Sequence, residues 1–569
     1  EHPRRAGVSA FGFGGTNFHA VLEEYTGAFL TASPPAVSQH WPGELLLWGG
    51  VSRREILADI DRLEQALEAG ATPRLQDLAY TLWRRVREWS PSDGGPEPRL
   101  AVVTTSLDDL RQKLTVAREA LRGPGSIEIH DLRGISYTEE PLARAGRVAF
   151  LFPGQGSQYP DMLRELAVQF PEVRERFERA DRVLRDSFPQ PLSSTIFPPP
   201  RFIQAEEQAC QRALTQTNVA QPALGAADLG LCQLLHALGV TPDMVAGHSY
   251  GEYVALCAAG VFSEAVLYTL SEARGRFIIE EGPKDLGTMA AAEAEQGAVV
   301  EALQSLEGVW IANLNAPRQT IVSGSRPGVE EAVRRLEARG IRTRPLPVAC
   351  AFHSPLMAPA RDRLAAFLST FTFAEPHVEV YSNSTGAPYP RDPKSMATLL
   401  SEHLVRPIEF TSEVEAMYQA GARIFVEVGP KSVLTGLTQQ IIDKRPFLGV
   451  ALDAPGRTGI LQLQHALGQL FAHGVPVQLD RLYQGRALCQ LNLEALVEDT
   501  RERPLPPTAW LVDGRRARPA RETTGRTAPM GSPTREPSLS PTPIPPRAGQ
   551  RETETNPPIL AEGRADRAS

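Results

Sequence analysis

The chain has 569 residues, of which 42% are hydrophobic and 22% charged, and its formal net charge is −8. This length suggests several domains of ordinary globular composition, and the mildly acidic balance gives no electrostatic reason to expect nucleic acid or an anionic membrane as a partner. Five cysteines without a C-x-x-C pair argue against a disulfide framework or a zinc site and favour a reducing, cytoplasmic location.

Targeting signals are also missing from the sequence. No apolar run approaches the roughly 20 residues that span a bilayer, and the first residues do not form a secretory signal. The sequence begins with Glu1 rather than Met, so we expect it to be a segment of a longer chain.

Residues 1–25 predict two strands joined by a glycine-rich loop. The loop, Gly12 to Asn17, could suggest a phosphate cradle, but no Lys-Ser/Thr pair follows it and no helix begins after it. We therefore predict a tight turn between two buried strands.

Residues 26–146 alternate strands and helices on the scale of a small α/β domain. The expected strands are Glu44–Trp48, Leu100–Thr104 and one near 134–137, and the expected helices are 52–69, 75–85 and 107–121.

A second and longer alternation of strands and helices runs from residue 147 to about 445, beginning with the β-type run Val148–Phe152. Within it, residues 283–347 form a distinct β-α-β-β-α-β series, the order typical of a ferredoxin-like fold. Its expected strands are 288–292, 309–313, 319–323 and 343–348, and its expected helices are 298–306 and 328–339.

The last part of the chain divides at about residue 516. Residues 446–515 form a further segment, after which Pro, Arg, Ser, Thr and Gly dominate and apolar residues nearly vanish. Such a composition cannot bury enough apolar surface to offset the entropy of ordering, so we predict a disordered linker over 516–569.

The sharpest chemical signal is a G-x-S-x-G pattern at Gly247, Ser249 and Gly251. A short apolar strand precedes it and a helix follows through Val254 and Val261, which is the strand–turn–helix setting of a nucleophile elbow. A Cβ at either glycine would clash with neighbouring backbone. The turn exposes the serine hydroxyl at a helix N-terminus, where free amides favour developing negative charge.

A serine hydroxyl also needs a base to take its proton. His248 adjoins the serine on the wrong side of the elbow, so we expect it to support the turn. His353 follows a strand and precedes a predicted helix, where a loop can present the imidazole. On local sequence alone, a structural role for His353 stays open.

Five motifs occur in the order that is typical of malonyl-coenzyme A:acyl carrier protein transacylases, including the acyltransferase domains of polyketide and fatty-acid synthases, which the chain resembles over 147–445. These motifs are Phe152-Pro-Gly-Gln-Gly-Ser-Gln158, Gly247-His-Ser-Tyr-Gly-Glu252, Ala273-Arg-Gly275, Ala351-Phe-His-Ser354 and Glu427-Val-Gly-Pro-Lys431. The resemblance implies an α/β fold: an α/β-hydrolase-like large subdomain with an inserted ferredoxin-like small subdomain, preceded by a small α/β linker domain.

The resemblance also implies roles for individual residues. Ser249 is the nucleophile and His353 its base, and the backbone carbonyl of His403 holds the imidazole in place of an acidic third member. Relatives carry Gln or Asn where this chain has His403, a departure of little consequence if only the main chain is used. The oxyanion hole is formed by the backbone amides of Gln155 and Tyr250.

Arg274 matches the arginine that pairs with the free carboxylate of malonate. A guanidinium binds a carboxylate with two parallel hydrogen bonds and stays charged at any working pH. Phe352 resembles the phenylalanine of malonyl-specific domains, where methylmalonyl-specific ones usually carry Ser. One methyl group is worth about 1–3 kcal/mol in a pocket, so this preference is expected to be leaky.

The flanking segments resemble other parts of such synthases. Residues 1–25 resemble the closing strands of a ketosynthase, 26–146 the linker domain before the acyltransferase, and Arg503–Trp510 the segment that returns toward the ketosynthase. The nucleophilic Cys and the paired His residues of a ketosynthase are missing, so we expect no condensing activity and, without the ketosynthase dimer, a monomer.

The function that follows is a ping-pong transfer of malonyl from malonyl-coenzyme A, through a seryl ester, to the phosphopantetheine thiol of an acyl carrier protein, with no metal or tightly bound cofactor. The expected partners are the carrier protein and the ketosynthase of the same synthase. Alternatives are a serine hydrolase that releases acyl groups to water, the same transferase acting on methylmalonyl or acetyl groups, and a docking segment whose chemistry has decayed.

Overall fold

The computed structural model describes residues 4–11, 17–24, 38, 40–89, 97–125, 128–281, 287–346, 348, 350–500, 510–512 and 517–519. The chain divides into two units, one made of residues 1–27 and 503–569 and the other of residues 28–502. Among the described helices, none combines the length and the apolar character that a membrane crossing requires. The glycine-rich loop 12–16, most of the predicted returning segment Arg503–Trp510 and nearly all of the linker 516–569 lie outside the described residues.

The first unit contains two antiparallel hairpins. β1 (Arg5–Ala10) pairs with β2 (Phe18–Glu23), and β17 (Trp510–Val512) pairs with β18 (Ala517–Pro519). The prediction that the strands of residues 1–25 are buried is wrong: every residue of β1 and β2 is exposed, including Phe18 and Val21. The physical reason is that two strands alone have no second layer against which to bury a face.

The second unit begins with a small α/β domain that covers the predicted linker range. Its sheet has the order β3-β4-β6-β5 and is antiparallel throughout. Its elements are β3 (Glu44–Gly49), α1 (Arg53–Glu68), α2 (Leu75–Glu88), β4 (Arg99–Thr104), α3 (Leu107–Leu121), β5 (Glu128–Asp131), β6 (Ile135–Thr138) and the 3-10 turn η1 (Leu142–Arg144).

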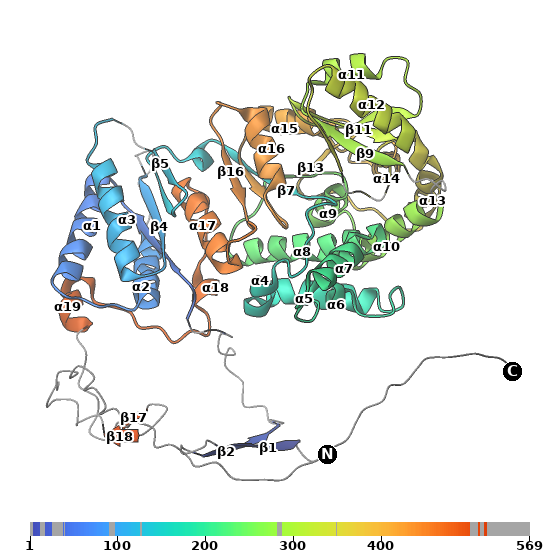
Figure 1. The fold of residues 1–569 in the computed structure, drawn as a ribbon. Helices are drawn as coiled ribbons and strands as arrows, with labels where there is room; N and C mark the ends of the chain where they lie inside the picture. The colour runs from blue at the N-terminus through green and yellow to red at the C-terminus, as the bar shows by residue number, and fades with distance from the viewer. Residues whose placement is uncertain are drawn as a thin grey trace, which may run out of the picture. The chain divides into compact units, whose positions relative to one another are not determined.

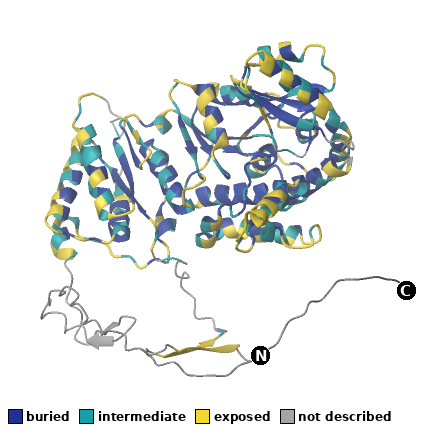
Figure 2. Ribbon diagram, in the orientation of Figure 1, coloured by how far each residue is buried: buried dark blue, intermediate teal, exposed yellow. Residues whose placement is uncertain are grey.

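The large subdomain is built on a twisted sheet in the order β14-β13-β8-β7-β15-β16, with helices on both faces (Figure 1). From β13 to β16 neighbouring strands are parallel, and β14 pairs antiparallel to β13. Parallel strands covered on both faces need continuous apolar runs. Residues 148–152 of β7 and all of β8 are buried, and the strands in the middle of this subdomain are mostly dark blue, that is buried, in Figure 2.

The strands of the large subdomain are β7 (Arg147–Phe152), β8 (Met244–Gly247), β13 (Glu379–Ser382), β14 (Ala387–Pro388), β15 (Ala422–Glu427) and β16 (Leu448–Ala451). Its helices are α4 (Arg164–Gln169), α5 (Pro171–Val183), α6 (Leu192–Ile196), α7 (Gln204–Thr215), α8 (Thr217–Ala237), α9 (Gly251–Ala258), α10 (Glu264–Glu281), η2 (Pro355–Met357), α13 (Ala358–Leu368), α14 (Pro393–Glu402), α15 (Phe410–Gln419) and α16 (Val433–Ile442).

The small subdomain is inserted between α10 and η2 and has the β-α-β-β-α-β order that the sequence predicts. Its elements are β9 (Thr288–Ala292), α11 (Gln296–Leu303), β10 (Val309–Ala316), β11 (Gln319–Gly324), α12 (Arg326–Ala338) and β12 (Thr343–Pro345). The antiparallel sheet order β10-β11-β9-β12 places the first and third strands at its centre, as in a ferredoxin-like fold. The predicted two-subdomain α/β fold is therefore what the structure has.

The segment after β16 returns to the small α/β domain. α17 (Gly459–Ala472) packs against β3, β4 and β6 on one side and against β16 and α4 on the other (Figure 1). Gly468 brings this helix close to the sheet, because a Cβ there would lie 3.2 Å from side chains of both Leu45 and Ala101. Then follow α18 (Asp480–Tyr483), η3 (Leu493–Ala495) and α19 (Leu496–Asp499).

Candidate active site

Ser249 lies in a sharp turn between β8 and α9, with a left-handed backbone at φ +51°. The two flanking glycines make this turn possible. A Cβ on Gly251 would lie 1.9 Å from the carbonyl oxygen of Phe152, and a Cβ on Gly247 would lie 2.0 Å from the carbonyl carbon of Gly251. The predicted clash of any larger residue with backbone is confirmed at both positions.

The helix after this turn is shorter than predicted. α9 ends at Ala258, where Gly260 takes φ +83° and the amide of Val261 donates to the carbonyl oxygen of Leu256 at 3.0 Å. This is the six-to-one hydrogen bond of a Schellman helix end. Arg274 lies on α10, the second helix after the elbow.

His353 lies opposite the elbow and forms a hydrogen bond with the predicted nucleophile. The Nε2 atom of His353 is 2.8 Å from the Oγ atom of Ser249. Its Nδ1 atom is 3.1 Å from the carbonyl oxygen of His403. Because a carbonyl only accepts, Nδ1 carries the proton in the neutral ring, and Nε2 is the atom free to accept from the serine hydroxyl.

The surroundings of His353 keep its imidazole neutral. Its side chain is buried, and burial together with the positive charge of Arg274 lowers its pKa to about 3. A neutral imidazole has a lone pair for the proton of Ser249 at any ordinary pH. Like Ser249, His353 has a left-handed backbone, at φ +56°.

The two residues expected to supply the oxyanion hole lie on separate segments: Gln155 after β7, and Tyr250 immediately before α9. Gln155 follows β7, in a loop that presses on the elbow so closely that a Cβ on Gly154 would lie 2.3 Å from the carbonyl oxygen of His248. Within the described residues, neither the amide of Gln155 nor that of Tyr250 donates a hydrogen bond. The phenol of Tyr250 turns away into the core, where it bonds to Ser271 Oγ at 2.6 Å.

Arg274 is a buried cation beside the histidines. Its side chain is 1% exposed, and its guanidinium carbon lies 5.2 Å from the centre of the Tyr253 ring. Its Nε and Nη2 atoms donate to none of the described residues. Its charge lowers the pKa of both His353 and His403, which places all three in one electrostatic environment.

Phe352 and His403 complete the set of predicted residues. Phe352 is buried next to the base, with 6.4 Å between the centres of the Phe352 and His353 rings. The ring of His403 is fully buried, and neither of its nitrogens has a hydrogen-bond partner among the described residues. Its Nε2 atom lies 3.7 Å from a carboxylate oxygen of Glu252.

His248 supports the turn from the other side. Its Nε2 atom lies 2.8 Å from Oδ1 of Asn315, which belongs to β10 of the small subdomain. The inserted subdomain therefore holds one flank of the elbow, and the position of His248 agrees with the expected supporting role.

A layer of polar residues behind the elbow was missed by the sequence reasoning. Burial raises the pKa of Glu252 to about 7, against hydrogen bonds from Tyr389 and Asn383. Asn383 in turn contacts the amide of Ser249 and the side chain of Glu413. Glu252 stands in the elbow motif and could have been singled out, but Asn383 and Glu413 lie more than a hundred residues away with no local pattern to mark them.

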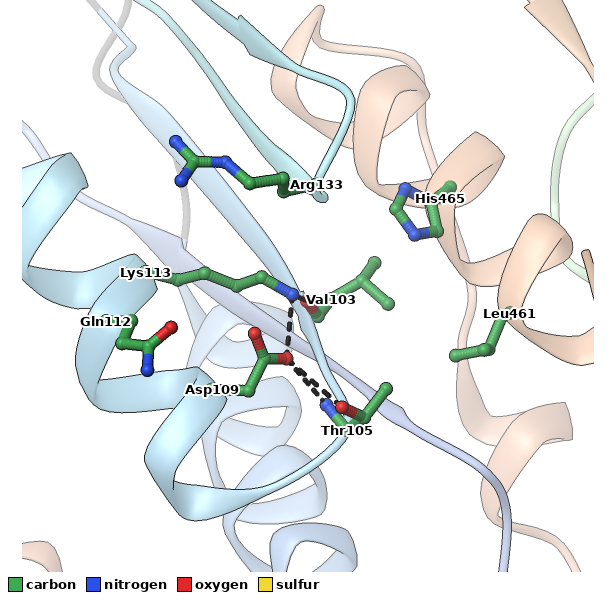
Figure 3. A pocket seen from close by; sticks show the side chains of 8 residues that line it. All are labelled: Val103, Thr105, Asp109, Gln112, Lys113, Arg133, Leu461 and His465. Atoms are coloured by element: carbon green, nitrogen blue, oxygen red, sulfur yellow. Dashed lines mark hydrogen bonds and ion pairs between the residues drawn. The ribbon is translucent and has the colours of Figure 1, made fainter.

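A cavity of about 300 Å³ lies away from this site, between β4, α3 and α17 (Figure 3). Figure 3 shows Lys113 bonded to Asp109, at 2.8 Å, and Lys113 also donates to the carbonyl oxygen of Val103. Arg133 at its edge pairs with Asp131. The cations around this cavity are thus satisfied by the chain itself, and the reactive groups gather at Ser249.

Comparison with known proteins matches the region of the chain that contains Ser249, His353 and Arg274. Residues 149–483 match the family described as acyl transferase domain. One component of the polyunsaturated fatty acid synthase of Thraustochytrium sp. is 33% identical over 504 residues, which is 84% of this chain and 17% of that protein. The malonyl CoA-acyl carrier protein transacylase of Bacillus subtilis is 37% identical over 316 residues, which is 54% of this chain and 94% of that enzyme.

Among solved structures, the acyltransferase domain from the second module of the salinomycin polyketide synthase has a TM-score of 0.59 and 30% identity. The match covers 79% of this chain and 97% of that domain. The synthases among the first curated relatives are much longer than this chain, which spans between 6% and 22% of their lengths.

Proposed function

Because this chain belongs to the acyl transferase domain family, we propose that it transfers a malonyl unit from malonyl-coenzyme A to the phosphopantetheine thiol of an acyl carrier protein, as part of a polyketide or polyunsaturated-fatty-acid-type synthase. The observation that carries the proposal is the hydroxyl of Ser249 bonded at 2.8 Å to a neutral imidazole, beside the buried guanidinium of Arg274.

In the first half of the proposed reaction, the malonyl carboxylate pairs with Arg274 and the thioester carbonyl faces the elbow. Ser249 Oγ attacks that carbonyl carbon as its proton passes to Nε2 of His353. The negative oxygen of the tetrahedral intermediate accepts hydrogen bonds from the amides of Gln155 and Tyr250. The carbon–sulfur bond then breaks, and His353 returns the proton to the sulfur of coenzyme A.

In the second half, the carrier's thiol gives its proton to His353 and attacks the malonyl-serine ester. The carbon–oxygen bond breaks and Ser249 recovers its proton. The carbonyl oxygen of His403 holds Nδ1 of His353 throughout, at the 3.1 Å of the resting structure. As proposed, only side chains and amides of this chain act on the acyl group, while coenzyme A and phosphopantetheine serve as carriers.

The malonyl preference is proposed from Arg274 and Phe352 together. A buried guanidinium favours an acyl group that ends in a carboxylate over plain acetyl. Phe352, packed beside His353, opposes a methyl branch on the carbon next to the thioester. We also place the chain in the cytoplasm, since its five cysteines are all free thiols.

The test is intact mass of the protein after incubation with malonyl-, methylmalonyl- or acetyl-coenzyme A. We expect a malonyl adduct on the wild type and none on Ser249→Ala. Adding a carrier protein should move the adduct to the carrier's thiol. An adduct on Ser249→Ala, or release of the acyl group to water at the same rate with and without carrier, contradicts the transfer.

A further inference from the structure

The amide of Ser249 has an acceptor that lies outside the five motifs of the sequence analysis. Asn383 follows β13 and is fully buried. Its Oδ1 atom accepts from the backbone amide of Ser249 at 2.6 Å. Its Nδ2 atom donates to Oε2 of Glu413 at 2.5 Å. The side chain therefore spans the distance between the elbow and α15.

The main chain of Asn383 is held as tightly as its side chain. Its amide donates to Oε2 of Glu252 at 2.7 Å, and its carbonyl oxygen accepts from the amide of Glu409 at 2.7 Å. Glu252 lies in the first turn of α9 and Glu409 immediately precedes α15. Asn383 thus cannot shift without disturbing both helices that flank it.

This arrangement answers a physical need of the elbow. A left-handed backbone is unfavourable for a non-glycine residue, and such a conformation persists only where the surroundings enforce it. Ser249 precedes α9, and an amide at a helix N-terminus has no carbonyl of that helix to donate to. A buried amide without an acceptor would add a further penalty, and the Oδ1 atom of Asn383 removes it.

Glu413 decides which end of the Asn383 side chain faces the nucleophile. Its side chain is fully buried, and burial together with the charge of Glu252 raises its pKa well above the usual range. Whether charged or neutral, its Oε2 atom accepts from the NH2 group of Asn383, which turns the Asn383 oxygen toward Ser249.

We propose that Asn383 is a positioning residue for the nucleophile: its side-chain oxygen holds the amide of Ser249 and so keeps the serine Oγ within reach of His353, while Glu413 fixes the orientation of the Asn383 amide. The inference rests on the proposed transferase function for its substrate, but not for the placement of the serine.

The experiment measures the rate at which Ser249 is acylated, by rapid quench with malonyl-coenzyme A. Asn383→Leu keeps a similar volume and removes the acceptor, and we expect acylation to slow about 100-fold with KM changed less than about threefold, as for a misplaced reacting group. Glu413→Gln still offers an oxygen to Asn383, and should stay within about threefold of wild type, whereas Glu413→Leu should slow acylation about 10-fold.

Two further variants separate positioning from general destabilisation. Leu437→Ala opens a cavity in α16, in the same core cluster as α15, and removes no hydrogen bond to Ser249 or Asn383, so it should lower the melting temperature and leave acylation unchanged. Asn383→Asp combined with Glu413→Gln reverses the second hydrogen bond and keeps an acceptor for Ser249, so acylation should recover to within about 10-fold of wild type.

A serine-directed fluorophosphonate provides a second readout that does not depend on malonyl-coenzyme A. If wild type reacts with this probe but with no acyl thioester, the proposed function fails while Asn383 can still be judged by probe labelling. The positioning role is overturned if folded Asn383→Leu labels and acylates like Leu437→Ala. Should Asn383→Leu not fold, equal rates for Glu413→Gln and Glu413→Leu overturn it instead.

Discussion

Ser249 and His353 share an unusual backbone, since both are non-glycine residues with φ near +50° to +56°. Conformations of this kind concentrate at functional sites, where the fold holds them against their intrinsic cost. Here Gly247 and Gly251 allow the close backbone packing around Ser249. The carbonyl oxygen of His403 accepts a hydrogen bond from the ring of His353. The pair is therefore preorganised before any substrate arrives.

The neutral state of His353 gives a prediction about pH. Its pKa is lowered to about 3 by burial and by Arg274, so kcat/KM for acylation should stay flat as pH falls from 8 to about 5. In Arg274→Gln the positive neighbour is gone, the imidazolium is less disfavoured, and the acid limb should move to higher pH. Acylation by malonyl- and acetyl-coenzyme A across pH tests this, and an acid limb that stays in place would contradict it.

Arg274→Gln should also change which thioester is used. In the proposed binding mode, removing the guanidinium takes a charge-assisted partner from malonyl-coenzyme A and none from acetyl-coenzyme A. The ratio of the two kcat/KM values should therefore move toward acetyl, by about 100-fold for a loss near 3 kcal/mol. The same kinetic series supplies the measurement.

Phe352 supports a separate prediction about the branched substrate. Phe352→Ser replaces a buried ring beside His353 with a small side chain. We expect methylmalonyl-coenzyme A to gain about 10-fold relative to malonyl-coenzyme A, in line with about 1–3 kcal/mol per methyl. Competition between the two thioesters, read as adduct masses, measures the ratio. An unchanged ratio would show that another residue excludes the methyl group.

At this scale, the sequence was informative wherever a residue belonged to a contiguous motif. Ser249 was identified from its own strand–turn–helix motif, and His353 and Arg274 were identified from short motifs through the family resemblance. Asn383 and Glu413 have no such neighbourhood, because their role depends on contacts across more than a hundred residues. The buried ring of His403 was likewise invisible, since only its main-chain carbonyl had been considered.

Among the elements, α8 and α10 cross with their backbones in contact. The contact occurs at Gly275, where a Cβ would lie 2.4 Å from the Cα of Asn218. This close approach places Arg274, the preceding residue, at the base of the site. The glycine in the Ala273-Arg-Gly275 motif is thus explained by packing between helices.

Gly275→Ala should separate these helices. We expect a loss of about 1–3 kcal/mol in unfolding free energy from overpacking, together with slower use of malonyl-coenzyme A because Arg274 moves. The matched control is Gly436→Ala on the exposed face of α16, where a Cβ meets nothing within 4 Å. That change should gain about 0.5–1 kcal/mol. Urea unfolding measures both, and equal effects would contradict the packing argument.

Elements with strong periodicity were predicted closely, and those with irregular ends were not. Helix 107–121 and strand 288–292 have the predicted bounds. The edge strand β5 was missed because Glu128–Asp131 is short and mostly polar. The end of α9 was placed too late because the left-handed turn at Gly260 depends on a six-to-one hydrogen bond that apolar spacing does not reveal.

For the whole molecule, buried histidines and buried carboxyl groups determine how the stability depends on pH. Burial lowers the pKa of His353 to about 3 and that of His465 and His473 to about 4. Burial raises the pKa of Glu252 and Glu427 to about 7, and it also raises the pKa of Asp228 and Glu413 well above the usual range of a carboxyl group.

Together, these histidines and carboxyl groups predict a pH at which the folded protein is most stable. Below about pH 6.5 the unfolded histidines bind protons that the folded ones do not, so stability falls as pH drops toward 4. Above about pH 4 the folded carboxyls keep protons that the unfolded ones lose, so stability falls as pH rises through 7. The pKa values of His236, His248 and His403 are lowered too, so between about pH 4 and pH 6.5 the six histidines outnumber the four carboxyls and stability rises with pH. Melting temperature should therefore peak near pH 6, and Glu413→Gln should decline less on the alkaline side. A steady rise from pH 5 to pH 9 would contradict this balance.

At this scale the fold class could be predicted from the sequence, but the exposure of the β1–β2 hairpin could not. Alternating runs determine that strands and helices form layers, but the exposure of Val21 and Phe18 depends on what lies against them. The same holds for α17, whose apolar stripe does not say which sheet it covers.

The position of α17 has a practical consequence for grafting this region into another protein. The strands β3 and β4 precede the two subdomains in the chain. α17, which follows the subdomains, packs against the sheet that contains β3 and β4. Cutting at residues 147 and 445, where the resemblance begins and ends, would transfer the two subdomains without α17. The sheet of β3 and β4 would be separated from them as well. Junctions before β3 and after α19 would keep α17 and the sheet that it covers in the same piece.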